Sequence, residues 1–120
     1  MSPFGRFGGR RRPRTPADAD RRALRQLEAL GADLTKPRHV IHFVYFDDET
    51  SAQRAATEIE KAGYATKIVA PDERFRDWRV HADATRVIGH TTVDGFRSWF
   101  EQVALTYGGE YDGWEAARTP

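Results

Sequence analysis

The sequence of 120 residues contains no cysteine and no long apolar run. Without cysteine the chain can form neither a disulfide nor a thiolate metal site, and it has no thiol nucleophile, which is typical of a reducing compartment. The longest apolar run, residues 40–46, is interrupted by His42 and is far shorter than the roughly 20 residues of a membrane helix. The arginines near the N-terminus are not followed by the apolar segment of a secretory signal. We therefore predict a cytoplasmic protein with no membrane partner.

A net charge of +1 conceals two regions of opposite charge. Residues 1–16 contain five arginines, three glycines, three prolines and no acidic residue. Residues 17–120 contain the other 14 basic residues and all 18 acidic residues, and so have a net charge of about −4. A segment as rich in arginine, glycine and proline as the first cannot bury enough apolar surface to fold by itself. We predict a disordered basic arm over residues 1–16 and a single folded domain over residues 17–120.

Three segments have apolar residues at helical spacing and end close to glycine: residues 17–30, 50–62 and 92–107. Before the first helix, residues 15–18 form a capping box with proline at the first helical position. Asp47 and Asp48 precede the second helix, where carboxylates stabilise the N-terminus. Thr91 and Asp94 have the spacing of a capping box for the third.

Four segments rich in β-branched and aromatic residues predict strands: residues 39–46, 64–70, 75–86 and 110–117. A turn at residues 71–73 indicates that the second and third strands form an antiparallel hairpin. Gly113, inside the last strand, indicates a bulge or the close approach of another backbone. After the leading helix, the order of elements is therefore βαββαβ. We predict an α+β, ferredoxin-like sandwich, in which two helices cover one face of a four-stranded antiparallel sheet and an extra N-terminal helix precedes it.

The histidines do not form a convincing catalytic or metal site. His39 and His42 are three apart on one predicted strand, so they point to opposite faces and cannot share a metal ion. His81 and Asp83 share a face and could act as a base and its orienting partner, but no motif links a nucleophile to them. A polar pair on the sheet surface is the simpler interpretation. We therefore predict a protein that is not an enzyme, with no metal, cofactor or small-molecule substrate.

RNA binding is an alternative function. An RNA-recognition module has the same βαββαβ order and exposes aromatic side chains on its strands, and three aromatic residues here lie on predicted strands: Phe43, Tyr45 and Trp78. The basic-glycine-aromatic signature of such modules is missing from residues 75–81, and the acidic charge of the domain disfavours phosphate binding. Weak RNA contact could come from four arginines of the arm: Arg10, Arg11, Arg12 and Arg14. The alternative is that these arginines serve only to keep the chain soluble.

The segment Gly109–Glu115 has the sequence Gly-Glu-Tyr-Asp-Gly-Trp-Glu, which contains too many unusual residues for a generic strand. It resembles the E-Y-D-G-W signature that closes the regulator of ribonuclease E activity B family. Other features are similar to that family at the level of pattern: the helix end at residues 30–33 before Pro37, the strand at 39–46, the helix exit at 62–64 and the strand at 80–83. The resemblance extends over about residues 20–118.

This resemblance implies a non-catalytic ferredoxin-like domain that binds ribonuclease E and lowers its activity, thereby altering which transcripts are degraded. It places the candidate partner-binding residues in the signature: Glu110, Tyr111, Asp112 and Trp114. Asp112 and Trp114 are the strongest of these candidates. For Tyr111 and Trp114 a structural role that anchors the last strand is the favoured alternative, because buried aromatic side chains contribute packing energy first.

Overall fold

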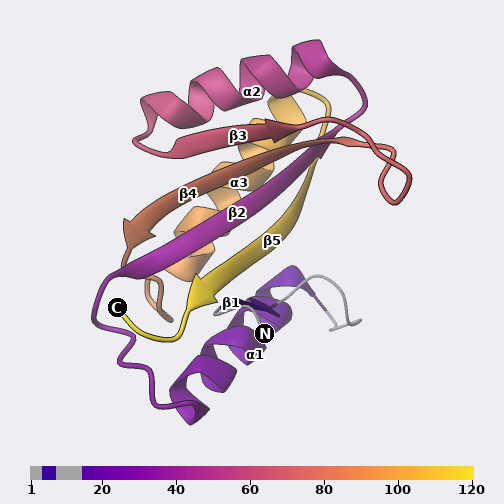
Figure 1. The fold of residues 1–120 in the computed structure, drawn as a ribbon. Coiled ribbons are helices and arrows are strands. Elements are labelled where there is room, and N and C mark those ends of the chain that lie inside the picture. The colour runs from indigo at the N-terminus through magenta and orange to yellow at the C-terminus, as the bar shows by residue number, and fades with distance from the viewer. Residues whose placement is uncertain (1–3, 8–14) are drawn as a thin grey trace.

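Five antiparallel strands and three helices make up the computed structural model of the chain, which describes residues 4–7 and 15–120 (Figure 1). The elements are β1 (Phe4–Phe7), α1 (Pro16–Ala29), β2 (Arg38–Phe46), α2 (Glu49–Lys61), β3 (Ala65–Val69), β4 (Trp78–Arg86), α3 (Val93–Thr106) and β5 (Glu110–Ala117). The strands lie in the order β1-β5-β2-β4-β3, and every neighbouring pair is antiparallel. The predicted α+β class is confirmed.

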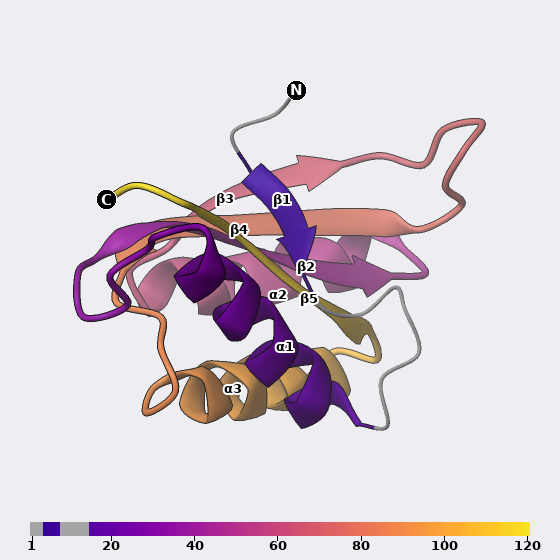
Figure 2. The same ribbon diagram turned by 90° about the horizontal axis from the view of Figure 1, so that it is seen from below.

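All three helices cover the same face of the sheet. In β2 the alternate residues Val40, Val44 and Phe46 are buried on this face. Val44 and Phe46 belong to a cluster with residues of α2 and α3, whereas Val40 belongs to a second cluster with residues of α1. Figure 2 shows α1 and α3 on the same side of the sheet. The helices therefore divide one continuous sheet face into two adjoining cores.

Two of the predicted helix starts are confirmed in detail. The Thr15 hydroxyl accepts a hydrogen bond from the backbone N–H of Asp18 at 3.0 Å, so Thr15 is the N-cap of α1. The Asp48 carboxylate accepts one from the N–H of Ser51 at 2.7 Å and caps α2. These bonds satisfy N–H groups that have no partner within the helix.

The start of α3 differs from the prediction. The N-cap is Thr92 rather than Thr91, and its side chain makes no capping bond with the helix. The Thr92 hydroxyl instead accepts from the N–H of Gly89 at 2.9 Å and donates to the carbonyl of Val87 at 3.1 Å. The predicted capping box of Thr91 and Asp94 is therefore wrong, because local bonds in the preceding loop compete for the threonine that begins the helix.

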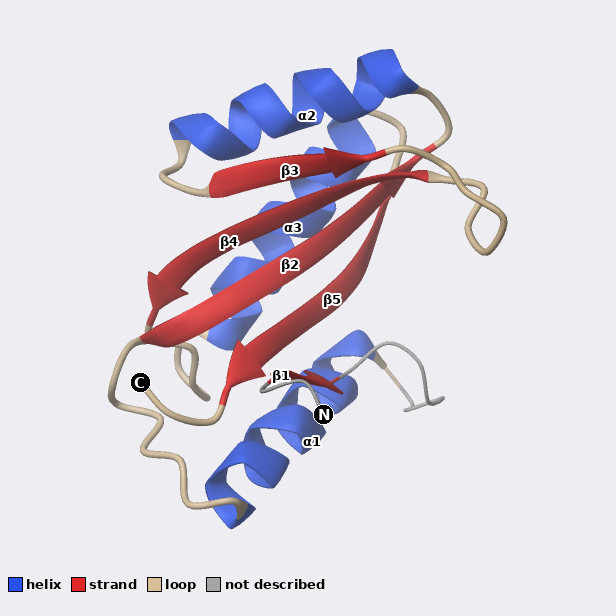
Figure 3. Ribbon diagram, viewed as in Figure 1, coloured by secondary structure: helices blue, strands red, loops and turns tan. Residues whose placement is uncertain are grey.

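The predicted hairpin of β3 and β4 is present, but its loop is longer than predicted (Figure 3). β4 begins only at Trp78, and residues 70–77 connect the strands. In this loop the Asp72 carboxylate accepts from the N–H groups of Arg74 and Phe75 at 2.8 and 3.0 Å. Side-chain bonds of this kind hold the backbone in a turn instead of a strand ladder.

Part of the N-terminal segment is described by the structure and forms a strand. Residues 4–7 form β1, which pairs with the outer edge of β5 and places Phe7 opposite Trp114. Composition could not indicate this strand, because its hydrogen-bond partners are supplied by the far end of the chain. The candidate RNA-binding residues Arg10, Arg11, Arg12 and Arg14 lie outside the described residues, so the arm and its boundary with the domain stay predictions.

None of the helices in the described part of the chain is long and apolar enough to cross a membrane.

Candidate functional site

The signature segment contains a β-bulge. Across β2 and β5, Phe43 lies opposite Gly113 but Val44 lies opposite Tyr111, so Asp112 is an extra residue in β5. Gly113 has φ of 105°, a conformation that residues with a side chain rarely adopt. The predicted bulge at Gly113 is therefore confirmed. It explains why aspartate and glycine stand next to each other in the motif, since a bulge favours glycine at a position with positive φ.

The bulge decides where the two aromatic residues of the signature point. Residues three apart on a regular strand lie on opposite faces. The extra residue Asp112 reverses the alternation, so Tyr111 and Trp114 both lie on the face that the helices cover. Trp114 is only 1% exposed and belongs to the core cluster with α1, while Tyr111 packs against the cluster of α2 and α3.

Trp114 is held by a buried ion pair between two helices. Its indole N–H donates to Oδ1 of Asp20, a fully buried residue of α1, at 2.9 Å. The guanidinium of Arg97, on α3, donates to both oxygens of the same carboxylate, with 2.9 Å from Nη2 to Oδ1. Burial lowers the pKa of Arg97, but the hydrogen bond and the charge of Asp20 outweigh that effect and raise it above its usual range. This network fastens α1, α3 and β5 together.

Tyr111 continues the network toward the centre of the sheet. Its ring lies under the Arg97 guanidinium, with 4.9 Å from Cζ to the ring centroid, and its hydroxyl is 2.7 Å from Nδ1 of His42. The His42 ring is 1% exposed and stacks on Phe100 with 4.0 Å between centroids. Burial, with a smaller contribution from the charge of Arg97, lowers the pKa of His42 to about 3. Burial likewise raises the pKa of Tyr111 well above its usual value. Both groups are therefore neutral at pH 7.

The other two candidate residues of the signature reach the surface. Glu110 is exposed, and Asp112 is half-buried and accepts a hydrogen bond from the Tyr45 hydroxyl at 2.9 Å. Glu110 also lines a hollow of about 220 Å³ at the end of the sheet where β2 finishes and β5 begins. We call this the acidic hollow, because three of its lining residues are carboxylates: Asp47, Asp77 and Glu110. Within the described residues, no three histidine or acidic side chains are placed to hold a metal ion.

The backbone next to the acidic hollow requires glycine. A Cβ at Gly109 would lie 2.4 Å from the Tyr45 carbonyl oxygen and 2.4 Å from Cε1 of Phe46, which is closer than real Cβ atoms approach. Glycine therefore lets the start of β5 pass directly over the end of β2. That close approach brings Glu110 beside Asp47, which follows β2 in the sequence.

The histidine candidates are distributed as the sequence predicts. His39 and His42 lie on opposite faces of β2, His42 in the core and His39 half-exposed. Nε2 of His39 is 2.7 Å from Oδ2 of Asp83 on the neighbouring strand β4. His81 packs edge-on against Phe43, with 4.9 Å between ring centroids. Asp83 therefore forms a cross-strand polar pair with His39.

Sequence reasoning missed the residues that support the signature from the helices, Asp20 and Arg97. A signal for both was present. On α1, Asp20 lies three and four residues before Ala23 and Leu24 and therefore belongs to the apolar stripe of that helix. On α3, Arg97 lies four residues after Val93 and three before Phe100 and therefore belongs to the apolar stripe of that helix. A charged residue inside an apolar stripe indicates a buried partner, since unpaired buried charges are strongly disfavoured.

These features define a small α+β protein whose closing strand is bulged, anchored by a buried ionic network and flanked by an acidic surface hollow. Residues 17–116 match the family described as Regulator of ribonuclease activity B. The chain belongs to this family, whose members are regulators of ribonuclease activity, and the relationship that the closing motif indicates is thereby confirmed. A search of curated proteins found no match.

Proposed function

We propose that this protein is a non-catalytic regulator that binds ribonuclease E and lowers its activity. Family membership supports regulation of a ribonuclease, and the E-Y-D-G-W segment supports ribonuclease E as the particular partner. The observation that carries the proposal is the position of Glu110, which belongs to the signature and lines the acidic hollow. We expect the protein to act in the cytoplasm, by occupying a surface of the ribonuclease.

The signature divides into contact residues and positioning residues in this proposal. Glu110 and Asp112 face outward and would contact the ribonuclease, whereas Trp114 is buried, Tyr111 is half-buried against the core, and both hold β5 in place. The carboxylates of the hollow would attract a lysine- or arginine-containing segment, because opposite charges across an interface steer association and set specificity. The net charge of about −4 over residues 17–120 acts in the same direction.

We also propose that the domain is ferredoxin-like. From β2 onward the elements follow the order βαββαβ, and the strands lie in the order β5-β2-β4-β3. Both orders suit a split βαβ arrangement with its helices on one face. In this description α1 is an addition that extends the helical layer beside β5, and β1 is an added edge strand.

The proposal is tested with purified full-length protein and ribonuclease E from the same organism. We expect the two proteins to co-purify and the cleavage of a model RNA to slow at micromolar concentrations of the regulator. Glu110→Lys should weaken binding by about tenfold or more, since like charges at an interface are costly. Glu28→Lys is the matched control, because Glu28 is an exposed acid of α1 that does not line the hollow. Absence of binding and of inhibition at micromolar protein would rule out the proposed function.

RNA binding through the basic arm, assisted by the open sheet face, is the second candidate. It is motivated by the five arginines and absence of acids in residues 1–16. A variant with glutamine at positions 10, 11, 12 and 14 should lose RNA affinity, and the affinity of the unmodified protein should fall steeply between 50 and 200 mM salt, as phosphate contacts require. If the variant binds RNA as well as the unmodified protein, the arm does not bind RNA.

A further inference from the structure

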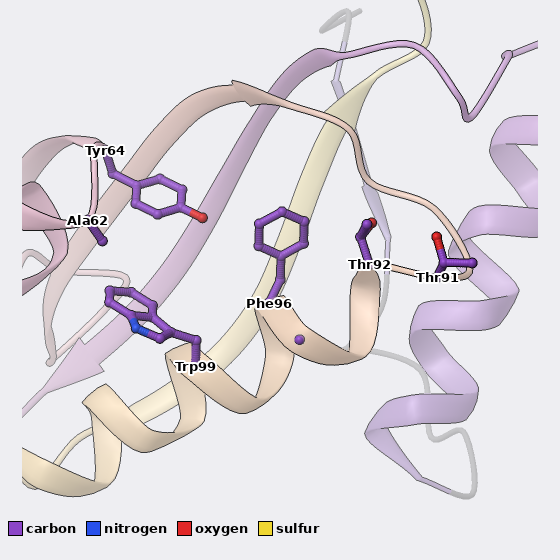
Figure 4. A pocket seen from close by; sticks show the side chains of 7 residues that line it. Ala62, Tyr64, Thr91, Thr92, Phe96 and Trp99 are labelled. Carbon is purple, nitrogen blue, oxygen red and sulfur yellow. The ribbon is translucent and has the colours of Figure 1, made fainter.

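A cavity of about 410 Å³ lies between the end of α2 and the first turns of α3 (Figure 4). Three aromatic side chains line it: Tyr64, Phe96 and Trp99. Its other lining residues are small or carry hydroxyl groups: Ala62, Thr91, Thr92 and Gly95. Its volume falls within the range of small-molecule sites, roughly 300–1,000 Å³. The cavity shares no lining residue with the acidic hollow or with the signature.

The aromatic walls suit a flat ring. Tyr64 and Trp99 are nearly parallel and stack on each other, with 23° between their planes and 6.1 Å between centroids, so a flat ligand would pack beside this pair rather than between its rings. Figure 4 shows the Tyr64 hydroxyl pointing toward Phe96, across the space that these side chains line. Faces and edges of partly exposed aromatic rings stack on planar ligands such as nucleobases.

A positive charge stands beside these rings. The Arg86 guanidinium lies over the Tyr64 ring at 5.1 Å and is 3.5 Å from the carbonyl oxygen of Ala62, so it stands next to the cavity and contacts two of its lining residues without lining it itself. No carboxylate in the described part of the chain forms an ion pair with Arg86. An anionic group at this place would therefore gain a charge-assisted hydrogen bond.

A buried polar atom adjoins the same rings. The centroid of the His42 ring is 5.8 Å from that of Tyr64 and 5.7 Å from that of Phe96. Its Nδ1 meets the Tyr111 hydroxyl, but its Nε2 has no hydrogen-bond partner among the described residues. Buried polar atoms are normally paired, so Nε2 of His42 is an unsatisfied buried atom next to two of the rings that line the cavity.

We propose that the cavity binds a nucleotide, with the base against Trp99 and Phe96 and the phosphate on Arg86. The base supplies the flat ring and polar edge atoms, and the phosphate supplies the negative charge. The source is either a free nucleotide or one unit of a single-stranded RNA. The proposal goes beyond the regulation of a ribonuclease and does not depend on it, because binding is measured on this protein alone.

The test is a titration of the ¹⁵N-labelled full-length protein with adenosine monophosphate, followed by NMR. We expect shifts at Gly95, Thr91 and the Trp99 indole, with a Kd on the order of 1 mM for one stacked base and one charged contact. Adenosine should bind at least about fivefold more weakly, since it lacks the charge that Arg86 recognises. A six-residue oligoadenylate that binds more tightly than the monophosphate identifies RNA as the source, and equal or weaker binding identifies the free nucleotide.

Two variants and one control make the test specific. Arg86→Gln should weaken the monophosphate about fivefold or more while leaving adenosine unchanged. Gly95→Leu should abolish binding of both without unfolding the helix, because a Cβ at Gly95 meets only open space and leucine is a good helix former. Arg25→Gln, an exposed arginine of α1, should change nothing. No shifts at 10 mM monophosphate, shifts confined to other surfaces, or equal affinity for adenosine would each overturn the proposal.

Discussion

Lowering the pH from 7.5 to 5.0 should destabilise the protein by about 2 kcal/mol through His42 alone. Burial, assisted by the charge of Arg97, lowers the pKa of His42 to about 3, compared with 6.5 for an exposed histidine. Between these two values the unfolded chain binds a proton at this histidine and the folded protein does not, so stability falls as the pH decreases. The contribution is fully present above pH 6.5. Each pH unit below 6.5 lowers the free energy of unfolding by about 1.4 kcal/mol, and pH 5.0 lies 1.5 units below 6.5, which gives the loss of about 2 kcal/mol.

The assay is urea denaturation of the protein and of His42→Phe at both pH values. Phenylalanine keeps a ring against Phe100 but cannot take up a proton. The variant leaves the Tyr111 hydroxyl without its His42 partner, so its stability should be lower than that of the unmodified protein at pH 7.5. The decisive quantity is therefore the change in unfolding free energy between the two pH values within each protein. All other side chains, including the three remaining histidines, are the same in both proteins, so their contributions cancel in the comparison.

We expect the pH-dependent loss to be about 2 kcal/mol smaller in His42→Phe than in the unmodified protein. An equal loss in the two proteins would refute the reasoning, because it would show that His42 takes up its proton equally well in the folded state. A larger loss in the variant would do the same.

Three further substitutions test the architecture by the same urea assay at pH 7.5. Asp20→Asn should cost about 3 kcal/mol, since it leaves Arg97 without its buried countercharge; a cost below 1 kcal/mol would show that the network contributes little. Gly113→Ala should cost about 1–3 kcal/mol because of the positive φ at the bulge, and unchanged stability would contradict the bulged geometry. Gly95→Ala should instead raise stability by about 0.5–1 kcal/mol, because alanine is the better helix former and its Cβ meets no atom; a loss of stability would show that this position is more crowded than the structure indicates.

Local sequence patterns were sufficient for the identity of most elements. The caps at Thr15 and Asp48 are confirmed because a capping bond joins residues only three positions apart. The bulge at Gly113 is confirmed because glycine weakens the interior of a strand and is favoured there where the backbone bulges. The errors at Thr92 and in loop 70–77 have the same physical origin, since side chains that bond their own loop compete with the regular element beside it.

The family signature was visible in the sequence, but the roles of its residues were not. Whether Tyr111 and Trp114 reach a partner or the core depends on one extra residue in β5 and on its register with β2. Trp114 is held by Asp20, which lies 94 positions earlier in the chain. Asp20 is in turn paired with Arg97, which lies 77 positions after it.

The amino-acid sequence by itself determined the helices, most of the strands, the closing motif and the family relationship, because each depends on residues close together in the chain. Only the tertiary structure decided what the motif is attached to. The acidic hollow joins residues that follow β2, precede β4 and begin β5, and the buried ion pair joins two separate helices. Such sites depend on strand register and helix packing, which are set by the balance of burial over the whole domain rather than by any local pattern.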